Sequence, residues 1–194
     1  MKKLLAILLS VTCFGAYAQD SLGYYNQSRE HIKLTGMKVL GSWAAGNIAI
    51  GGISSFNTTG STKYFHQMNA FWNLVNLGAA TSGYLSSQKN KNKTLTADEV
   101  LMEQRKIEKI FLVNGALDVA YIGGGAYLNN RGINNNDDKL KGYGSSIILQ
   151  GAFLLLFDAT MYTSEKRNGK KLVQFLQTHP VNFDGHKIGM VFKL

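Results

Sequence analysis

The sequence predicts an all-α fold: an up-down-up-down bundle of four transmembrane helices, the third extended beyond the membrane, followed by a short strand-like C-terminal tail. Four windows without Lys or Arg predict it, and each is long enough for a helix to cross the roughly 20-residue bilayer core. The segments between these windows are polar and basic, as is typical of loops that flank membrane spans. The windows are Val39–Thr62, Tyr64–Gln88, Ile110–Asn130 and Gly142–Ser164.

The first residues follow the pattern of a secretory signal peptide. Met1–Lys3 is basic, Leu4–Leu9 opens an apolar run, and Ala16–Ala18 places small residues where a signal peptidase reads them. We expect cleavage after Ala18, and an uncleaved anchor is the alternative. Because cleavage removes Cys13, the only cysteine, the mature chain is expected to have no disulfide bridge and no cysteine nucleophile.

The length of the remaining chain, residues 19–194, suits a single four-helix membrane domain. The formal charge of +9 falls to +7 when Lys2 and Lys3 are removed. We interpret the basic residues as flanking the spans and contacting lipid headgroups. The expected partners are therefore the lipid bilayer and either another membrane protein or a second copy of the chain, with no nucleic acid and no cofactor.

The predicted elements follow in order along the chain. Residues 57–63 form a turn, and residues 86–94 and 129–141 are polar loops. Thr96–Glu99 matches a capping box, which predicts a helix from about Ala97 to Leu128 whose first third lies outside the membrane. The expected spans are about 39–56, 65–85, 110–128 and 145–163.

The segment after Ser164 is expected to be short and irregular. Leu172–Leu176 is predicted as a short interfacial helix that Pro180 stops. The last residues alternate apolar and other side chains, which is a strand-like period that requires a partner strand. The apolar members are Ile188, Met190, Phe192 and Leu194.

A soluble four-helix bundle is the competing architecture. Its helices should carry charged outer faces, and these windows have none. The membrane prediction is nonetheless marginal for the third span. Its eight Leu, Ile, Phe and Val residues contribute roughly −2.4 to −4.8 kcal/mol to insertion, while a central Asp costs roughly 2.5 to 3.5 kcal/mol. Such a span needs neighbouring helices to shelter its polar atoms.

The predicted location is a membrane of the bacterial cell envelope, with the inner membrane favoured and the outer membrane as the alternative. Translocation of the signal places fifteen Lys and Arg residues on the translocated side and four on the other. The positive-inside rule requires the reverse distribution. The two signals for topology therefore disagree.

Polar residues recur at helical spacing inside the spans and form the candidate ligand-binding set. Asn69, Asn73 and Asn76 share one face of the second span, and Asn114, Asp118 and Tyr121 share one face of the third. Such residues bind an ion, a proton or a polar ligand, or they only hydrogen-bond between helices. Asp158 is expected near a membrane face, where water hydrates it. The complete set is Asn47, His66, Asn69, Asn73, Asn76, Asn114, Asp118, Gln150 and Asp158.

Small residues are expected where helices pack closely in lipid. Ser42, Gly46 and Ala49 share one face of the first span, and Ala120 and Gly124 are four residues apart in the third. Ala80, Gly83 and Gly78 are expected to play the same part in the second span. Catalytic signals are weak, since there is no phosphate-binding glycine loop, no zinc spacing and no nucleophile elbow. No catalytic or metal-binding residue is assigned, and an enzyme is the third hypothesis.

The chain also resembles an uncharacterised family of small bacterial membrane proteins. The resemblance is carried by Lys38–Trp43, Tyr64–Gly78, Asn114–Tyr121, Gly142–Gly144 and Gln150–Gly151. It implies a signal peptide and four predicted helices, and it implies no activity and no functional residues. The leading hypothesis is an integral membrane protein that binds or conducts a polar or ionic species through its Asn/Asp core. The alternative is a structural or partner-binding subunit whose polar core only sets the helix packing.

Overall fold

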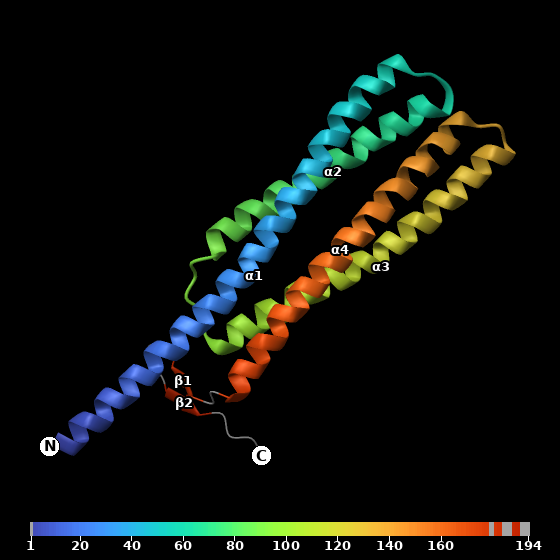
Figure 1. Cartoon of the computed structure of the whole chain (residues 1–194). Coiled ribbons are helices and arrows are strands. Elements are labelled where there is room, and N and C mark those ends of the chain that lie inside the picture. The colour runs from blue at the N-terminus through green and yellow to red at the C-terminus, as the bar shows by residue number, and fades with distance from the viewer. Residues whose placement is uncertain (1, 179–180, 184–187, 191–194) are drawn as a thin grey trace.

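A computed structural model describes the backbone of residues 2–178, 181–183 and 188–190, and the side chains of residues 22–178. Within these residues the chain forms four long helices, shown in Figure 1: α1 (Lys2–Asn57), α2 (Gly60–Asn90), α3 (Ala97–Asn134) and α4 (Asp138–Thr178). The predicted cleavage site falls within α1. Because the side chains of residues 2–21 lie outside the described set, the signal peptide stays a prediction.

The helices form two antiparallel hairpins that lie side by side (Figure 1). One hairpin pairs α1 with α2, and the other pairs α3 with α4. The main contact between the hairpins joins α2 to α4, while α1 makes smaller contacts with α4 and α3. This arrangement confirms the prediction of an all-α four-helix bundle.

The third helix begins as predicted. The Thr96 Oγ1 accepts a hydrogen bond from the backbone N–H of Glu99 at 3.3 Å, and the Thr96 N–H donates to the Glu99 Oε2 at 2.9 Å. These reciprocal bonds satisfy backbone donors that a helix start leaves unpaired. The capping box therefore sets the first turn of α3.

Both predicted polar loops are too long. Helix α2 continues to Asn90, and the loop predicted over residues 129–141 shrinks to three residues between Asn134 and Asp138. The Asp137 Oδ1 accepts from the backbone N–H of Lys139 at 2.8 Å and of Leu140 at 3.1 Å, so it caps α4. Polar composition marks these segments as hydrated, but hydrated helix ends have the same composition as loops.

The predicted interfacial helix is also wrong as a separate element. Leu172–Leu176 forms the last turns of α4, which runs unbroken from Asp138 to Thr178. Leu172 is fully buried and packs with Leu22, Ala97 and Val100, so tertiary contacts hold this segment in the bundle.

Two short strands follow α4. Strands β1 (Val181–Phe183) and β2 (Ile188–Met190) pair in an antiparallel ladder that places Asn182 opposite Gly189. Part of the predicted strand-like tail, Ile188–Met190, lies in β2. Pro180, Phe192 and Leu194 lie outside the described residues, as do His179 and His186.

The small residues that bring helices together agree only in part with those predicted to do so. A Cβ added at Gly51 would lie 2.7 Å from the backbone oxygen of His66, and one added at Gly125 would lie 2.9 Å from the oxygen of Gly144. Glycine therefore permits close contact between α1 and α2 and between α3 and α4. Of the predicted residues, Ala80 is buried and Gly83 packs against Met37. The others are exposed: Ser42, Gly46, Ala49, Gly78, Ala120 and Gly124. Small residues occur on several faces of these helices, so spacing alone did not identify the contact face.

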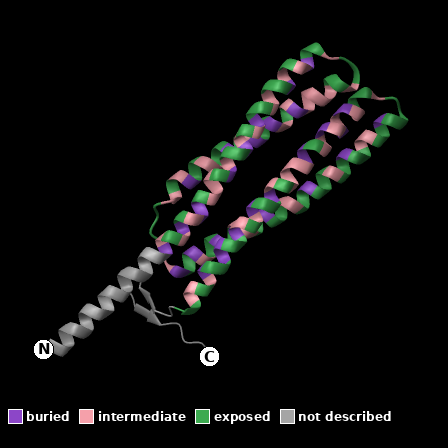
Figure 2. Cartoon of the chain, viewed as in Figure 1, coloured by how far each residue is buried: buried purple, intermediate pink, exposed green. Residues whose placement is uncertain are grey.

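Along the middle of the bundle, polar side chains lie inside and large apolar side chains lie outside, which is the reverse of a soluble protein. Buried residues alternate along each helix with exposed ones (Figure 2), and most of the buried ones here are polar or small. Many large apolar side chains face outward. Among those at least half exposed are Ile50, Ile53, Phe56, Phe71, Leu74, Val75, Leu112, Val119 and Leu156.

Candidate ligand site in the bundle core

A chain of side-chain hydrogen bonds joins α1, α2 and α4. The Asn69 Nδ2 donates to the Asn47 Oδ1 at 2.8 Å, and the Gln150 Nε2 donates to the Asn69 Oδ1. The Trp43 indole N–H donates to the Gln150 Oε1 at 3.0 Å, while the Trp43 ring stacks on Phe153. Three helices are thus tied together by groups that satisfy one another, and we call these residues the amide network.

The asparagine stripe on α2 continues this network. The Asn73 Nδ2 donates to the backbone oxygen of Asn69 at 2.8 Å, and the Asn76 Nδ2 donates to the Asn73 Oδ1 at 3.2 Å. All three asparagines are buried, with Asn73 completely so. Helical spacing correctly predicted that they share an inward face.

Two carboxyl groups meet where α3 packs on α4. Asp118 and Asp158 are 3% and 4% exposed, and their side chains lie within hydrogen-bonding range of each other. The Asn114 side chain also hydrogen-bonds Asp158. Two ionised carboxylates this close would repel each other, so a proton or a cation between them would stabilise the pair. The expectation that water hydrates Asp158 near a membrane face is wrong, since its side chain is buried.

One oxygen of this pair lacks a partner. The Asp118 Oδ2 is buried and makes no hydrogen bond within the described part of the chain. A buried polar atom without a partner is destabilising, since it loses water and gains nothing in return. Asp118 and Asp158, which we call the acid pair, therefore include one carboxyl oxygen without a hydrogen-bond donor.

The acid pair borders a cavity of about 300 Å³, which we call the bundle cavity. Its walls are mainly apolar side chains of all four helices. Four predicted site residues line it: Asn76, Asn114, Asp118 and Asp158. Asn47, Asn69 and Gln150 belong instead to the amide network, and Asn73 lies between the two groups.

His66 belongs to neither group. It is half-buried near the start of α2, beside Gly51, and its Nδ1 has no hydrogen-bond partner among the described residues. The structure therefore separates His66 from the other predicted site residues.

A buried ionic cluster at the other end of the bundle was not predicted. The Glu30 Oε1 lies 3.0 Å from the Arg29 Nη2, and its Oε2 lies 2.9 Å from the Lys33 Nζ. Arg29 and Glu30 are 2% and 1% exposed. The Arg29 guanidinium also donates to the Asn26 Oδ1 at 2.6 Å and to the backbone oxygen of Val100 at 3.4 Å.

Glu165 of α4 completes this cluster. Its Oε2 accepts from the Gln104 Nε2 at 3.3 Å, and the Gln104 Oε1 accepts from the Asn168 Nδ2 at 2.9 Å. Burial raises the pKa of Glu165 to about 8, although Gln104, Arg29 and Lys33 act in the opposite direction. In sequence Glu165 precedes Lys166 and Arg167 and reads as part of a hydrated segment, so only the packing of α4 could show its burial.

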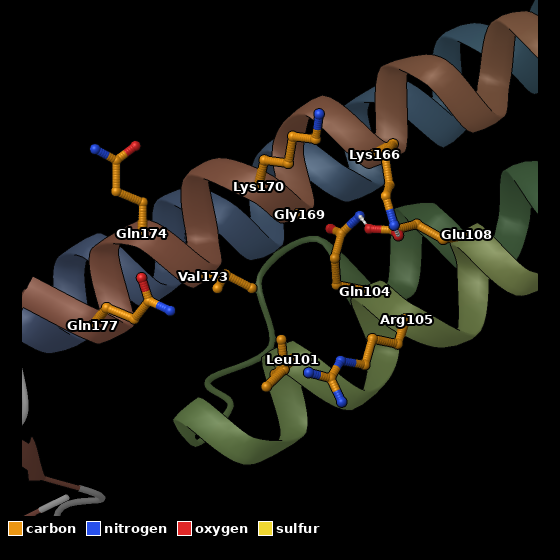
Figure 3. A pocket seen from close by; sticks show the side chains of 10 residues that line it. All are labelled: Leu101, Gln104, Arg105, Glu108, Lys166, Gly169, Lys170, Val173, Gln174 and Gln177. Atoms are coloured by element: carbon orange, nitrogen blue, oxygen red, sulfur yellow. Dashed lines mark hydrogen bonds and ion pairs between the residues drawn. The ribbon is translucent and has the colours of Figure 1, made fainter. Parts of the chain in front are cut away.

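A surface pocket of about 320 Å³ lies on the outer side of this cluster, between the start of α3 and the end of α4 (Figure 3). The Lys166 Nζ lies 3.2 Å from the Glu108 Oε2 and joins the two helices across it. Glu108 also accepts from the Gln104 Nε2 at 3.2 Å. These contacts connect the pocket wall to the buried cluster and satisfy the Glu108 carboxylate.

The fold and the site define a four-helix bundle with a polar interior and an apolar exterior. Residues 39–159 match the model of a family of unknown function, DUF6992, and the chain belongs to that family. This segment contains all nine predicted site residues, whereas Arg29, Glu30 and Glu165 lie outside it. Comparisons with curated proteins and with solved structures find no significant match.

Within the described residues, α3 and α4 are long and apolar enough to cross a membrane, by length and composition. Only 17% of the most apolar window of α3 and 33% of that of α4 is buried inside the bundle. A core helix of a soluble protein is mostly buried. The exposure of these windows is consistent with association with a membrane.

Proposed function

We propose that this chain is an integral membrane protein of the cell envelope whose four helices all cross the bilayer. The support is the outward-facing apolar surface along the middle of all four helices, together with the polar atoms gathered inside. In water such a surface would drive association. In a bilayer the same surface contacts hydrocarbon, which an apolar surface favours. Helices that pair their polar groups inside the protein are the structure expected there.

Within this setting, we propose that the acid pair binds a proton or a small monovalent cation. The observation that carries the proposal is the unpartnered Asp118 Oδ2, buried beside the Asp158 carboxyl on the wall of the bundle cavity. Carboxylates inside a membrane are costly unless something offsets their charge. A proton or a cation between the two groups would supply that offset and would complete the coordination of Asp118.

The amide network favours a second, structural role for the other polar residues. Asn47, Asn69 and Gln150 hydrogen-bond one another and leave little unsatisfied capacity for a ligand. Interhelical bonds of this kind in membranes contribute on average about 0.6 kcal/mol each. The proposal therefore assigns packing to the amide network and ligand binding to the acid pair.

Asp118→Asn tests the binding role. Infrared difference spectra of the protein in liposomes are recorded during a pH titration, and thermal unfolding in detergent is followed with NaCl, KCl or choline chloride. A proton site predicts a protonated carboxyl band that the variant loses. A cation site predicts stabilisation by Na⁺ or K⁺ over choline that the variant loses.

The matched control is Asn69→Asp, which adds a carboxyl to the amide network. This variant should unfold at a lower temperature but retain the titration or ion response of the acid pair. If Asp118→Asn leaves both responses unchanged, or if it only unfolds the protein, the binding role is wrong and a packing role remains.

A further inference from the structure

A second cavity, of about 370 Å³, opens at the end of the bundle next to the ionic cluster, and we call it the basic vestibule. Its lining brings four cations together against one carboxylate, Glu103. The cations are Arg29, Lys33, Lys93 and Lys106, from α1, the connection before α3, and α3. Asn26, Ser86 and Asn90 add neutral polar groups.

The positive charge of the vestibule is only partly neutralised. Glu30, behind the wall, pairs with both Arg29 and Lys33. Glu103 lies 3.9 Å from Lys106, and these side chains are 48% and 68% exposed, so this ion pair is weak. Lys93 makes no ion pair among the described residues. The vestibule thus favours an anion over a cation or a neutral group.

The basic vestibule adjoins the bundle cavity. Lys33, Ile107 and Ile110 line both. Beyond them the walls are mainly apolar, with Met37, Phe111 and Leu117 on the path toward the acid pair. Asp118 and Asp158 themselves are nearly fully buried, so the accessible wall is largely hydrocarbon. Together the two cavities form a groove with a basic end and a mainly apolar wall that suits a hydrocarbon chain.

The length of the groove matches one leaflet of a bilayer. From Ile110 to Tyr121, both on the cavity wall, the rise of an α-helix gives about 17 Å. Half of a bilayer core is about 15 Å. With the helices across the membrane as proposed above, the basic vestibule lies at headgroup level and the acid pair lies near the midplane.

We infer that this groove binds one anionic phospholipid, with its phosphate in the basic vestibule and an acyl chain along the bundle cavity. The inference rests on the proposed membrane location. Lys93 and Lys106 are exposed and supply the positive charge that would meet the phosphate. Arg29 is buried and donates to Asn26, Glu30 and Val100, so it fixes the wall behind them. The acyl chain reaches the acid pair, and the bound lipid covers the pair from the bilayer side.

The test uses the full-length protein purified in a nonionic detergent. Native mass spectrometry measures retention of dioleoyl phosphatidylglycerol and dioleoyl phosphatidylcholine, offered together in equal amounts. Glycerol 3-phosphate provides the headgroup without the chain, and dioleoylglycerol provides the chains without the charge. We expect phosphatidylglycerol to be retained at least about tenfold over phosphatidylcholine, and neither fragment to displace it at equal concentration.

Two pairs of variants locate the lipid. Lys93→Gln with Lys106→Gln should lower phosphatidylglycerol retention by roughly tenfold or more, because each basic residue near an anionic headgroup contributes about fivefold. The exposed lysines Lys89 and Lys171, changed together to Gln as the control, should have little effect. Ala79→Phe fills the groove and should also lower retention, whereas Ala116→Phe, exposed and away from it, should not.

Equal retention of both phospholipids overturns the inference, as does unchanged retention in the Lys93 and Lys106 variant. Displacement by glycerol 3-phosphate alone also overturns it, because the site would then recognise a free phosphate. If the protein stays monodisperse without detergent, the membrane proposal itself fails. If it needs detergent yet shows no phospholipid preference, only the lipid site fails.

Discussion

The two parts of the bundle have different surfaces, although both bury polar side chains. In the end segment (residues 22–38, 86–109 and 164–178), Leu22, Ala97, Val100 and Leu172 form a buried apolar core. The central segment (residues 39–85 and 110–163) contains eighteen of the twenty large exposed apolar side chains among the described residues. The end segment contributes only Tyr24 and Met102 to that set.

This contrast indicates two different solvents along the same helices. A chain in water exposes charged rather than large apolar side chains, as the surface of the end segment does. Hydrocarbon reverses the preference, because polar atoms there must find partners inside the protein. The basic vestibule and the ionic cluster lie where the two parts meet, at the level where charged side chains contact headgroups.

The largest expected effect tests the core of the end segment. Leu172→Ala removes a fully buried side chain and should destabilise the protein by about 2–5 kcal/mol, because it leaves a cavity. Leu156→Ala, in the central segment at 72% exposure, should change stability by less than about 1 kcal/mol in detergent. Chemical denaturation of both variants measures the difference. Equal losses would mean that Leu156 contacts protein rather than lipid.

The next effect tests whether lipid surrounds the exposed apolar side chains of the central segment. Leu156→Asp should impair membrane insertion by about 3 kcal/mol, because a carboxylate is costly in hydrocarbon. Met102→Asp, at 68% exposure in the end segment, should insert normally since water already surrounds it. Carbonate extraction of membranes that express each variant is the measurement. Normal retention of the Leu156→Asp protein would contradict the assignment of two solvents.

A smaller effect concerns pH and the ionic cluster. The pKa of Glu165 is raised from 4.5 to about 8 in the folded state, so the folded protein binds more protons than the unfolded chain between these values. Stability should therefore fall as pH rises through this window.

Glu165→Gln keeps an oxygen that accepts from Gln104 but cannot ionise. Its stability should lose this dependence, and at pH 9 it should exceed that of the unmodified protein. Glu103→Gln, at an exposed position, serves as the control and should keep the slope. A slope that persists in Glu165→Gln would assign the titration to another group.

The smallest expected effect separates the amide network from the acid pair. Asn69→Leu removes the side chain that joins Asn47 to Gln150 and should destabilise the bundle by about 1–2 kcal/mol in detergent. Asn57→Leu at the exposed end of α1 should change stability by less than about 0.5 kcal/mol. Thermal unfolding of the two variants measures this difference. The ion response of the acid pair, which is the stabilisation by Na⁺ or K⁺ over choline, is measured in each variant as well. Loss of that response in Asn69→Leu would mean that the amide network and the acid pair form one site.

Much of the fold was predictable from local chemistry. The windows without Lys or Arg indicated four long helices, and Thr96 with Glu99 marked the start of α3 because a capping box depends on residues three apart. The stripe of Asn69, Asn73 and Asn76 was found by helical period. Helix ends were predicted less well, because Asn, Asp and Lys suit both a loop and a hydrated helix end.

Contacts between helices were not predictable in the same way. Helical spacing placed Asp118 and Asp158 each on a helix face, but it did not reveal that these two faces meet. For close packing it selected Gly83, which does contact Met37, but also the exposed Gly46 and Gly124, and it missed Gly51 and Gly125. Nothing in the sequence indicated that Glu165 is buried, since its neighbours Lys166 and Arg167 suggested a hydrated segment.

The sequence by itself determined the helices and the periods of their polar faces, because helix formation and the exclusion of charge from apolar windows act over one helical turn or one span. The tertiary structure alone decided which faces meet, and so which polar groups are satisfied and which, like the Asp118 Oδ2, are left without a partner. The physical reason is that burial of a side chain depends on the rotation and register of neighbouring helices, which only the packing of all four together specifies.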